Sequence, residues 1–543
     1  MLVIPRATIS GMNAHGGTLA VEAARAHGVE VMFTLSGGHV FPLYDGAVKA
    51  DPPMRIVDVR HEQTAVFAAE AYAKLTRTPG LAVLTAGPGV TNGVSAVTTA
   101  HFNASPVLVL GGRAPAARWG SGSLQELDHP PILAPVTKSA STVAGTESIP
   151  GAVAGALRLA TTPRRGPVFL DVPMDVLFSY ADATVPAPEP LARSTSGDPE
   201  RIASLLTHAE RPVVVAGSDV WNDGAQDALR TFAEAHGVPV VMNGMGRGCL
   251  PADHPLAFAR VRGTAFGDAD LVVVVGTPLD FRLAFGAFGA ARVAHVVTAP
   301  EEVATHVDLA ASAAGPLPDL LRAMTAQGAH AEWVARLRAD EDAKRAVETA
   351  QLANDARPVH PARVYGALRE RLDRDAVVVC DGGDFVSFAG KYVESYRPGC
   401  WLDPGPYGCL GTGLGYAIAA RLARPDSQVV ALLGDGAAGF SLMDVDTLVR
   451  HDLPVVMVCG NNGIWGLEKH PMNFLYGYDV AADLQPGCRY DQVVAALGGH
   501  GELVTEPDGI GPALDRAFAS GKPAMVNVVT DPTVAYPRTS NLA

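Results

Sequence analysis

The strongest constraint on the fold is a pattern that repeats along the chain: a short apolar run, a glycine-containing loop, then an alanine-rich stretch with helical spacing. Residues 29–35 (VEVMFTL) precede SGGH, and residues 81–86 (LAVLTA) precede GPGVTN. Runs that are apolar throughout, rather than alternating, are typical of strands buried on both faces of a parallel sheet. The pattern therefore predicts an α/β fold.

The same pattern recurs in three segments, which we expect to be three doubly wound parallel-sheet domains. The first covers 8–185, and a linker rich in Pro, Ser, Thr and acidic residues is expected over 181–200. The second covers 195–345, and a polar helical stretch at about 331–355 leads to the third, at 358–540. A chain of 543 residues has room for this number of domains.

Composition excludes several classes of protein. The formal net charge of -14 counts against non-specific binding of nucleic acid. There is no run of 18 apolar residues, so no membrane-spanning helix is expected, and the N-terminus does not resemble a signal peptide. The six cysteines form no C-x-x-C pair, which favours reduced thiols in a cytoplasmic enzyme.

A glycine–aspartate–glycine stretch, Gly434–Gly436, follows the apolar run of the third segment. On its own, Asp435 in such a stretch is a turn residue. However, Asn462 lies 462 − 435 = 27 positions later, after one predicted helix (about 441–451) and one strand. A strand–helix–strand crossover brings both residues to the same edge of the sheet. Carboxylate and amide oxygens suit Mg²⁺, and the glycines allow a phosphate to approach, so we favour a metal–diphosphate site.

A second glycine-rich stretch, GCLGTGLGY at 408–416, invites comparison with a dinucleotide-binding motif. The residues before it, DPGPYG, do not form a strand pattern, so the context that this motif requires is missing. We interpret these glycines as positions of close packing near a ligand.

The combination of GDG with NN resembles the cofactor motif of the thiamine-diphosphate enzyme superfamily that contains pyruvate decarboxylase and acetohydroxyacid synthase. RHEQTAVFAAEAYAK, TAGPGVTN and GSLQELDH stand in the order of that family within the first segment. The resemblance implies a pyrimidine-binding, a middle and a diphosphate-binding domain, in this order. It implies Mg²⁺ ligands at Asp435, Asn462 and the carbonyl of Ile464. The expected cofactor-binding residues are Gly382, Gly383, Leu410, Gly434, Asp435, Gly436, Ala437, Asn462, Ile464 and Trp465.

The resemblance also implies catalytic residues in the first domain. Glu62, in RHEQ, matches the glutamate that binds the aminopyrimidine ring and drives proton transfer; alone it would be an ordinary helix-start glutamate. Gln125 resembles the active-site glutamine of acetohydroxyacid synthases and benzaldehyde lyase, and His39 a histidine of benzaldehyde lyase. In this family each site is shared between subunits, which implies a homodimer at least and commonly a tetramer.

Two enzymatic functions share all of these residues. The first is an acetolactate-synthase-like carboligase, which decarboxylates a 2-oxo acid such as pyruvate and ligates the acyl anion to a second carbonyl. The second is a lyase acting on a 2-hydroxyacyl-CoA or an aromatic acyloin. A non-catalytic nucleotide-binding homologue is a third hypothesis, against which the intact Glu62, Asp435 and Asn462 argue.

Three departures from the synthase pattern bear on this choice. In synthases a glutamine-rich stretch with a tryptophan follows the NN pair, whereas here Trp465 is in a different place and Pro471 stands where that tryptophan would fall. His39 points toward lyases. In the middle segment, GTPLDFRL loosely resembles a flavin-contacting stretch, but the strand end that would hold a ribose reads HVVTAPEE rather than an acidic DIDP-like sequence. Bound FAD is therefore left open, and the 463–490 segment and chain end are expected to decide the substrate.

Overall fold

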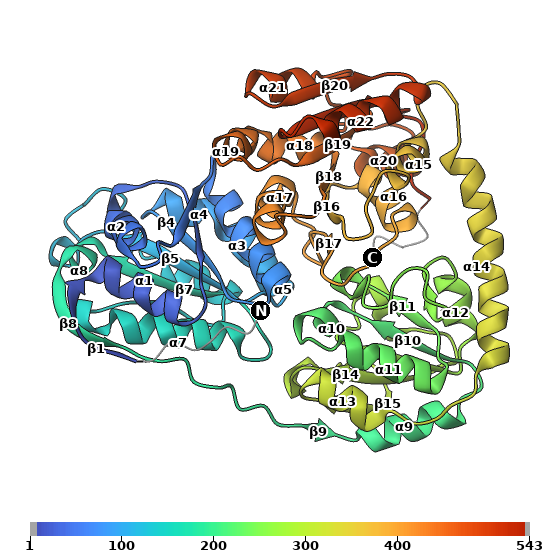
Figure 1. Ribbon diagram of the computed structural model, residues 1–543, viewed down its shortest axis with the longest axis horizontal. Helices are drawn as coiled ribbons and strands as arrows, with labels where there is room; N and C mark the ends of the chain where they lie inside the picture. Colours follow the sequence, from blue (N-terminus) through green and yellow to red (C-terminus); the bar gives the residue numbers. More distant parts are fainter. Residues whose placement is uncertain (1–7, 538–543) are drawn as a thin grey trace. The chain divides into compact units, whose positions relative to one another are not determined.

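The computed structural model describes residues 8–537, and its chain divides into two compact units (Figure 1). Of the described residues, unit 1 contains 8–192, 404–425 and 440–454. Unit 2 contains 193–403, 426–439 and 455–537. Two segments that lie between strands of the third domain in sequence thus group with the N-terminal part of the chain. The domain limits 8–185, 195–345 and 358–540 stay predictions.

Unit 1 is built on a six-stranded sheet with the order β3-β2-β4-β5-β7-β6, in which every pair is parallel. The strands are β2 (Val31–Thr34), β3 (Arg55–Asp58), β4 (Gly80–Leu84), β5 (Val107–Arg113), β6 (Ala140–Thr142) and β7 (Val168–Pro173). The apolar runs that indicated buried strands lie in β2, β4, β5 and β7, and all four are buried along almost their whole length.

Helices cover both faces of this sheet, as expected for a doubly wound domain. Alternate strand residues such as Val83, Leu108 and Leu170 share one core with α1 (Gly16–Ala26), α2 (Phe41–Lys49) and α7 (Ile149–Thr161). The remaining helices of the unit include α3 (Glu62–Thr76), α4 (Pro88–Asn92), α5 (Val94–Phe102), α6 (Pro130–Leu133), α8 (Met174–Phe178), α17 (Thr412–Ala423) and α19 (Val445–Arg450).

One part of the predicted linker is a strand. β8 (Tyr180–Val185) pairs antiparallel with β1 (Ile9–His15) in a two-stranded sheet. The prediction of a linker over 181–200 was therefore wrong at its start, because the proline-rich composition of the later residues hid the alternating burial of Ala183 and Val185. It was also wrong at its end, where a strand (Ser196–Gly197) and a helix (Pro199–His208) begin. No helix or strand occurs over 186–195.

Helix α17 packs directly against α3. A Cβ built on Gly415 would lie 2.8 Å from the Cβ of Phe67 and 3.1 Å from the Thr64 carbonyl oxygen, so only glycine allows this approach. The fully buried carboxylate of Glu70 on α3 accepts hydrogen bonds from Asn103, Ser105 and the Tyr416 hydroxyl. The interpretation of this glycine stretch as close packing is thus confirmed at Gly415.

A buried carboxylate holds the N-terminus of α3. Asp444 accepts hydrogen bonds from the Arg60 backbone N–H (2.8 Å), the Thr64 hydroxyl (2.7 Å) and the Thr447 hydroxyl (3.0 Å). Arg60 and Thr64 lie on either side of Glu62, the first residue of the helix. Asp444 therefore fixes the backbone that carries this glutamate.

Unit 2 contains two further sheets. The first has the order β12-β11-β10-β13-β14-β15-β9, with every pair parallel except β15 with β9. Its strands are β9 (Ser196–Gly197), β10 (Pro212–Ala216), β11 (Val240–Met242), β12 (Ala257–Phe258), β13 (Leu271–Val275), β14 (Arg292–Val297) and β15 (Leu309–Ala314). Its helices are α9 (Pro199–His208), α10 (Ser218–Asn222), α11 (Gln226–His236), α12 (Arg262–Asp268) and α13 (Leu317–Met324).

The other sheet of unit 2 is parallel throughout, with the order β17-β16-β18-β19-β21-β20. Its strands are β16 (Val377–Asp381), β17 (Trp401–Leu402), β18 (Val429–Gly434), β19 (Val456–Asn461), β20 (His500–Val504) and β21 (Ala524–Val529). Its helices are α15 (Pro361–Arg369), α16 (Asp384–Tyr392), α18 (Asp435–Ser441), α20 (Gly466–Tyr476), α21 (Tyr490–Ala496) and α22 (Ile510–Ala519). The predicted α/β class with three parallel-sheet domains is confirmed.

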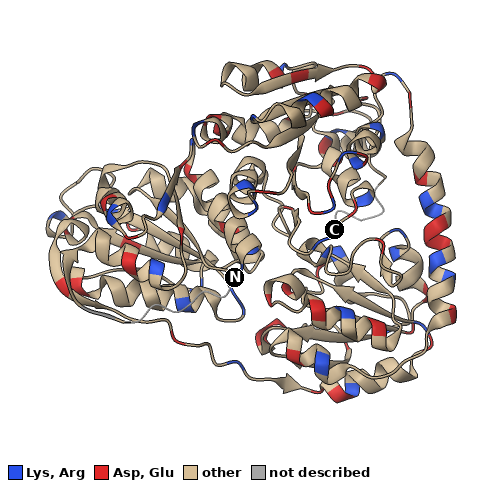
Figure 2. Ribbon diagram, in the orientation of Figure 1, with Lys and Arg blue, Asp and Glu red and all other residues tan. Residues whose placement is uncertain are grey.

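The polar helix expected near 331–355 is α14 (Ala331–Leu352), which carries charges of both signs along its length (Figure 2). Two of its carboxylates, Glu341 and Glu348, are buried against Arg260, which also contacts Glu394. These contacts attach α14 to both sheets of unit 2. They explain why a helix with little apolar character is nevertheless held in place.

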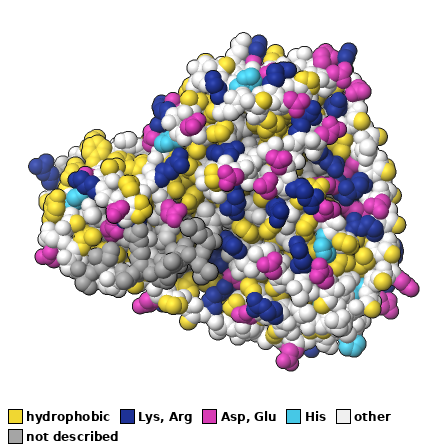
Figure 3. All heavy atoms as spheres, in the orientation of Figure 1, with side chains coloured by type: hydrophobic (Ala, Val, Ile, Leu, Met, Phe, Trp, Pro, Cys, Tyr) yellow, Lys and Arg dark blue, Asp and Glu magenta, His cyan; other side chains and the backbone are white. Residues whose placement is uncertain are grey.

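Basic and acidic side chains are interspersed on the face of the molecule seen in Figure 3. Over residues 8–537, no helix combines the length and apolar character needed to cross a membrane.

The contacts of Asp444 lead to a prediction about stability. Asp444→Ala would remove the acceptor of the Arg60 N–H and of two buried hydroxyls, those of Thr64 and Thr447, so we expect the free energy of unfolding to fall by roughly 2–4 kcal/mol. Urea unfolding followed by circular dichroism measures this loss. The control is Asp446→Ala, which removes a partly exposed ion pair with Arg450 and should cost less than about 1 kcal/mol. Equal losses in both variants would contradict the role of Asp444.

Candidate active site

Three loops meet at the carboxyl edge of the third sheet. In the register of adjacent strands, Asp381 at the end of β16 pairs with Leu433 of β18, and Gly434 pairs with Gly460 of β19. The residues that follow these strand ends are therefore neighbours. The crossover argument from the sequence correctly predicted that Asp435 and Asn462 lie at the same edge.

Asp435 is buried at this edge, with 3% of its surface exposed. It begins α18 directly after β18, so the predicted loop is instead a helix start. Its carboxylate accepts hydrogen bonds from the backbone N–H groups of Gly463 (2.6 Å) and Gly436 (2.9 Å). Burial nevertheless raises the pKa of Asp435 to about 6, because desolvation outweighs these bonds. A cation beside this carboxylate would favour its charged form.

The two asparagines of the NN pair differ in environment. Asn461 is buried and donates to the Cys488 carbonyl and to Asn527, so it holds the end of β19 to the rest of the unit. Asn462 is only partly buried, and its side-chain oxygen accepts from the Ile464 N–H at 3.2 Å. Asn462 is thus the member of the pair whose oxygen lies on the loop that follows the strand.

The glycines of these loops explain their tight packing. A Cβ on Gly436 would lie 2.4 Å from the ring of Trp465, so this ring covers Gly436. Gly382, at a φ of +127°, approaches the Gly434 nitrogen and the Ala437 Cβ, where a Cβ of its own would lie 3.1 and 3.3 Å away. Gly434 differs: a Cβ there would meet no heavy atom of the described residues within 4 Å. The space beside Gly434 is where a phosphate could approach the backbone.

The oxygens available here fit Mg²⁺ better than a metal that prefers nitrogen or sulfur ligands. Within residues 8–537 there is no group of three or more His, Cys, Asp and Glu that could hold a metal. One buried carboxylate, one amide oxygen and backbone carbonyls leave coordination positions for phosphate and water, which is how Mg²⁺ is commonly bound. The residues present therefore fit a metal–diphosphate group, and Gly383, packed against Leu467, belongs to the same set of loops.

Glu62, in unit 1, is the first residue of α3 and is 7% exposed. Its Oε2 accepts a hydrogen bond from the Asn92 side chain at 3.0 Å. A Cβ built on Gly89 would lie 3.8 Å from Glu62 Oε1 and 2.6 Å from the Thr85 methyl group, so these two side chains flank Gly89. The glutamate thus has one oxygen engaged by Asn92 and the other directed toward the glycine-rich loop.

His39 and Gln125 line one pocket of about 500 Å³ in unit 1. The His39 Nδ1 lies 3.3 Å from the Thr85 hydroxyl, and burial lowers the pKa of His39. Gln125 lies at a φ of +59°, and the neighbouring Gly87 leaves no room for a Cβ, which would lie 2.8 Å from that of Gln125. The structure therefore brings His39 and Gln125 together in one pocket. Thr85, which contacts His39, also lies beside Gly89, as Glu62 does.

Two buried residues beside this pocket, His129 and Asp171, were not predicted from the sequence. The fully buried His129 accepts from the Gly87 N–H through Nε2 (2.9 Å), and its Nδ1 bonds the buried carboxylate of Asp171 (2.9 Å). Asp171 also contacts Arg113 at 2.8 Å. The motif LQELDH contains His129, but nothing in its spacing reveals a partner on β7.

Leu410 also lies in unit 1 and is half-buried. The next residue, Gly411, has a φ of +92°, and a Cβ there would lie 2.8 Å from the side-chain nitrogen of Gln63 and 3.0 Å from Phe440. Leu410 thus stands beside the start of α3. The predicted residues form two groups: Glu62, His39, Gln125 and Leu410 in unit 1, and Gly382, Gly383, Gly434, Asp435, Gly436, Ala437, Asn462, Ile464 and Trp465 in unit 2.

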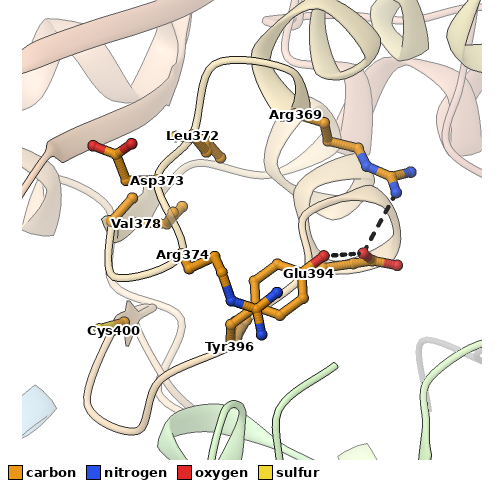
Figure 4. A pocket seen from close by; sticks show the side chains of 10 residues that line it. Arg369, Leu372, Asp373, Arg374, Val378, Glu394, Tyr396 and Cys400 are labelled. Atoms are coloured by element: carbon orange, nitrogen blue, oxygen red, sulfur yellow. Dashed lines mark hydrogen bonds and ion pairs between the residues drawn. The ribbon is translucent and has the colours of Figure 1, made fainter. Parts of the chain in front are cut away.

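Unit 2 contains a smaller pocket of about 40 Å³, between the end of α15 and the segment after α16 (Figure 4). Its charges are paired with each other: Glu394 accepts from the Tyr396 hydroxyl and contacts Arg369, and Arg374 stacks on the Tyr396 ring. Its size and internal pairing indicate a structural role rather than a site for a substrate.

Segment 463–490, expected to determine the substrate, contains a helix that was not predicted. α20 spans Gly466–Tyr476 and continues through Pro471. Its C-terminal end bears exposed apolar residues, namely Phe474, Leu475 and Tyr476. Lys469 and Asn473, which lie one turn apart on either side of Pro471, both bond Asp479.

Comparison with known families gives three matches in sequence order. Residues 14–132 match the thiamine pyrophosphate enzyme N-terminal TPP binding domain, 199–324 the central domain, and 381–528 the C-terminal TPP binding domain. The first range includes β2 to β5, the second β10 to β15, and the third β17 to β20.

Individual relatives extend the similarity along the whole chain. A probable acetolactate synthase of Mycobacterium bovis and an acetolactate synthase large subunit of Mycobacterium tuberculosis are each 53% identical, over 99% of this chain and 99% of theirs. A 2-hydroxyacyl-CoA lyase 2 of Caenorhabditis elegans is 35% identical, over 96% of this chain and 90% of its own. The chain therefore belongs to the thiamine pyrophosphate enzyme family, and within it is similar to the acetolactate synthases.

Proposed function

We propose that this protein is an acetolactate-synthase-like carboligase, which decarboxylates a 2-oxo acid such as pyruvate and joins its acyl group to a second carbonyl. The observation that carries the proposal is the 53% identity to acetolactate synthases over 99% of both chains. The presence of Glu62, Asp435 and Asn462, of which Glu62 and Asp435 are buried, supports a catalytic rather than a regulatory protein.

The residues of unit 2 would hold the cofactor through its metal and phosphates. Asp435, the Asn462 side-chain oxygen and the Ile464 carbonyl are the proposed Mg²⁺ ligands. The backbone of Gly382, Gly383, Gly434, Gly436 and Ala437, with Trp465 and with Leu410 of unit 1, would contact thiamine diphosphate. When bound, this cofactor supplies the electron sink for making and breaking carbon–carbon bonds.

The residues of unit 1 would move protons and orient the substrate. Glu62 would hold the transferred proton on Oε1, because Oε2 is engaged by Asn92. His39, kept neutral by its lowered pKa, and Gln125 would donate hydrogen bonds to a substrate carbonyl or hydroxyl oxygen in the pocket that they share. Glu62 and the metal site belong to different units of one chain, which is compatible with the expected homodimer whose sites combine two subunits.

FAD is not part of the proposed cofactor set. The segment after β14 reads Val297, Thr298, Ala299 before its first acidic residues, and Glu302 accepts a hydrogen bond from Thr298 at 2.5 Å. An acidic side chain at the strand end, which would bind a ribose, is therefore not provided there. A homotetramer and a cytoplasmic location complete the proposal; six cysteines without a disulfide fit a reducing compartment.

A 2-hydroxyacyl-CoA lyase is the second candidate, favoured by a specific observation. The lyase of Caenorhabditis elegans is 35% identical over 96% of this chain, and His39 lies in the substrate pocket where a lyase would use it. An acyloin lyase would use the same residues.

Product analysis separates these functions. With thiamine diphosphate and Mg²⁺ present, we expect pyruvate alone to yield a decarboxylated acetohydroxyacid product, detected by chromatography with mass spectrometry. Cleavage of a 2-hydroxyacyl-CoA without turnover of pyruvate would instead establish the lyase. Turnover of neither, nor of an acyloin, would refute both assignments.

The role of Glu62 predicts a selective loss of turnover. Glu62→Gln keeps the Asn92 contact but cannot exchange a proton, so we expect kcat to fall at least about 100-fold. Calorimetry should show cofactor affinity changed by less than about threefold, since the metal ligands are intact. Glu30→Gln, an exposed glutamate before β2, is the control and should retain full activity. Full turnover in the Glu62 variant would exclude the proton-transfer role.

The metal site predicts a loss of cofactor binding. Asp435→Asn preserves the size of the side chain but removes its charge, so we expect the Mg²⁺-dependent affinity for thiamine diphosphate to fall at least about tenfold. The matched control is Asp426→Asn, an exposed aspartate before β18. Titration calorimetry with and without Mg²⁺ measures both. An unchanged affinity in the Asp435 variant would exclude Asp435 as a ligand.

A further inference from the structure

The pocket that contains His39 and Gln125 has one permanently charged residue in its lining, Arg118. The lining is otherwise neutral apart from the histidine: small residues around Gly37 and Gly38, the hydroxyls of Ser36, Thr85 and Ser123, and apolar groups. No carboxylate is among the residues that line it. Arg118 is exposed, and a pocket whose lining carries a single sign of permanent charge attracts a ligand of the opposite charge.

The segment that carries Arg118 is rigidly built. Arg118 ends a short 3-10 turn, 116–118, whose first two backbone N–H groups, at Ala116 and Ala117, donate to Asp175 at 2.9 and 3.1 Å. The following loop is held by Glu126, which accepts from the N–H groups of Gly120 and Ser123. The arginine therefore projects from a fixed backbone rather than from a free loop.

The nearby carboxylates have other hydrogen-bond or ion-pair partners than Arg118. Asp175 and Glu126 could each have paired with an arginine, but both are committed to backbone N–H groups. Asp128 and Asp171 both pair with Arg113, whose guanidinium stacks on Trp119 at 3.8 Å. Of the two arginines in this segment, Arg113 is fully engaged. In the part of the chain that the structure describes, Arg118 has no ion pair.

We propose that Arg118 binds the anionic group of the substrate, so that His39 and Gln125 meet the reacting carbonyl. This inference rests on the proposed function, and it names the substrate class as anionic: a 2-oxo acid through its carboxylate, or an acyl-CoA through a phosphate. Guanidinium suits both, because it forms two parallel charge-assisted hydrogen bonds with either group. A neutral acyloin would leave the arginine without a partner.

Kinetics with Arg118→Gln and Arg118→Lys test this role. For the anionic substrate that the wild type turns over, we expect the KM of Arg118→Gln to rise about tenfold, with kcat changed less than about threefold. Arg118→Lys keeps the charge but not the paired geometry, so its KM should lie between those of the wild type and of Arg118→Gln. In a second reaction, pyruvate is the donor and a neutral aldehyde is the acceptor. The KM for the aldehyde should be the same in the wild type and in Arg118→Gln. Comparing pyruvate with a 2-hydroxyacyl-CoA identifies the source of the anion.

A binding measurement separates this proposal from the proposed function. Oxamate, an unreactive analogue of a 2-oxo acid, is titrated by calorimetry into protein loaded with thiamine diphosphate and Mg²⁺. Arg118→Gln should weaken oxamate binding about tenfold, whereas Arg230→Gln, an exposed arginine of α11, should not. If Arg118→Gln loses oxamate binding but the wild type turns over none of the substrates, the anion site is supported and the carboligase function is rejected.

Two results would overturn the role of Arg118. One is oxamate binding that is equally strong in the wild type and in Arg118→Gln, or absent from both. The other is an equal rise in KM for the anionic substrate and for the neutral aldehyde, which would indicate a general distortion of the loop.

Discussion

The burial of one carboxylate, Asp435, is the constraint on which the arrangement of the third sheet depends. A charged group with 3% exposure is costly unless it is bonded, and two backbone N–H groups, from Gly436 and Gly463, compensate only in part. Burial raises the pKa of Asp435 to about 6, because these two bonds do not offset its desolvation. The oxygens and glycines around it fit a cation with its phosphates, which is the group proposed for this edge of the sheet.

The fold and half of the site could be predicted because they depend on local patterns. Continuous apolar runs identified β4, β18 and β19, since strands buried on both faces need no polar alternation. The 27 positions between Asp435 and Asn462 correspond to one crossover, and parallel pairing of β18 with β19 follows from it. Family membership then rests on three matched regions and on relatives that cover the whole chain.

Other features depend on contacts between distant residues, which no local pattern reveals. His129 and Asp171 are 42 positions apart, and each alone has the character of an ordinary core or surface residue. The strand β8 was hidden by its proline-rich neighbours. The assignment of residues 404–425 and 440–454 to unit 1 likewise arises from packing, as of Gly415 on Phe67, and not from order in the chain.

The short segment from Asp435 to Asp444 serves two purposes. It begins with the proposed metal ligand and, 444 − 435 = 9 positions later, ends with the carboxylate that holds Arg60 and Thr64 on either side of Glu62. Both aspartates are buried, and desolvation raises the pKa of both. Asp435 lies at the start of α18, and its carboxylate accepts hydrogen bonds from backbone N–H groups. Asp444 lies at the other end of the segment and accepts from Arg60 and Thr64. The segment therefore supplies one buried carboxylate to each of the two units: Asp435 to the loops of unit 2, and Asp444 to the support of α3 in unit 1.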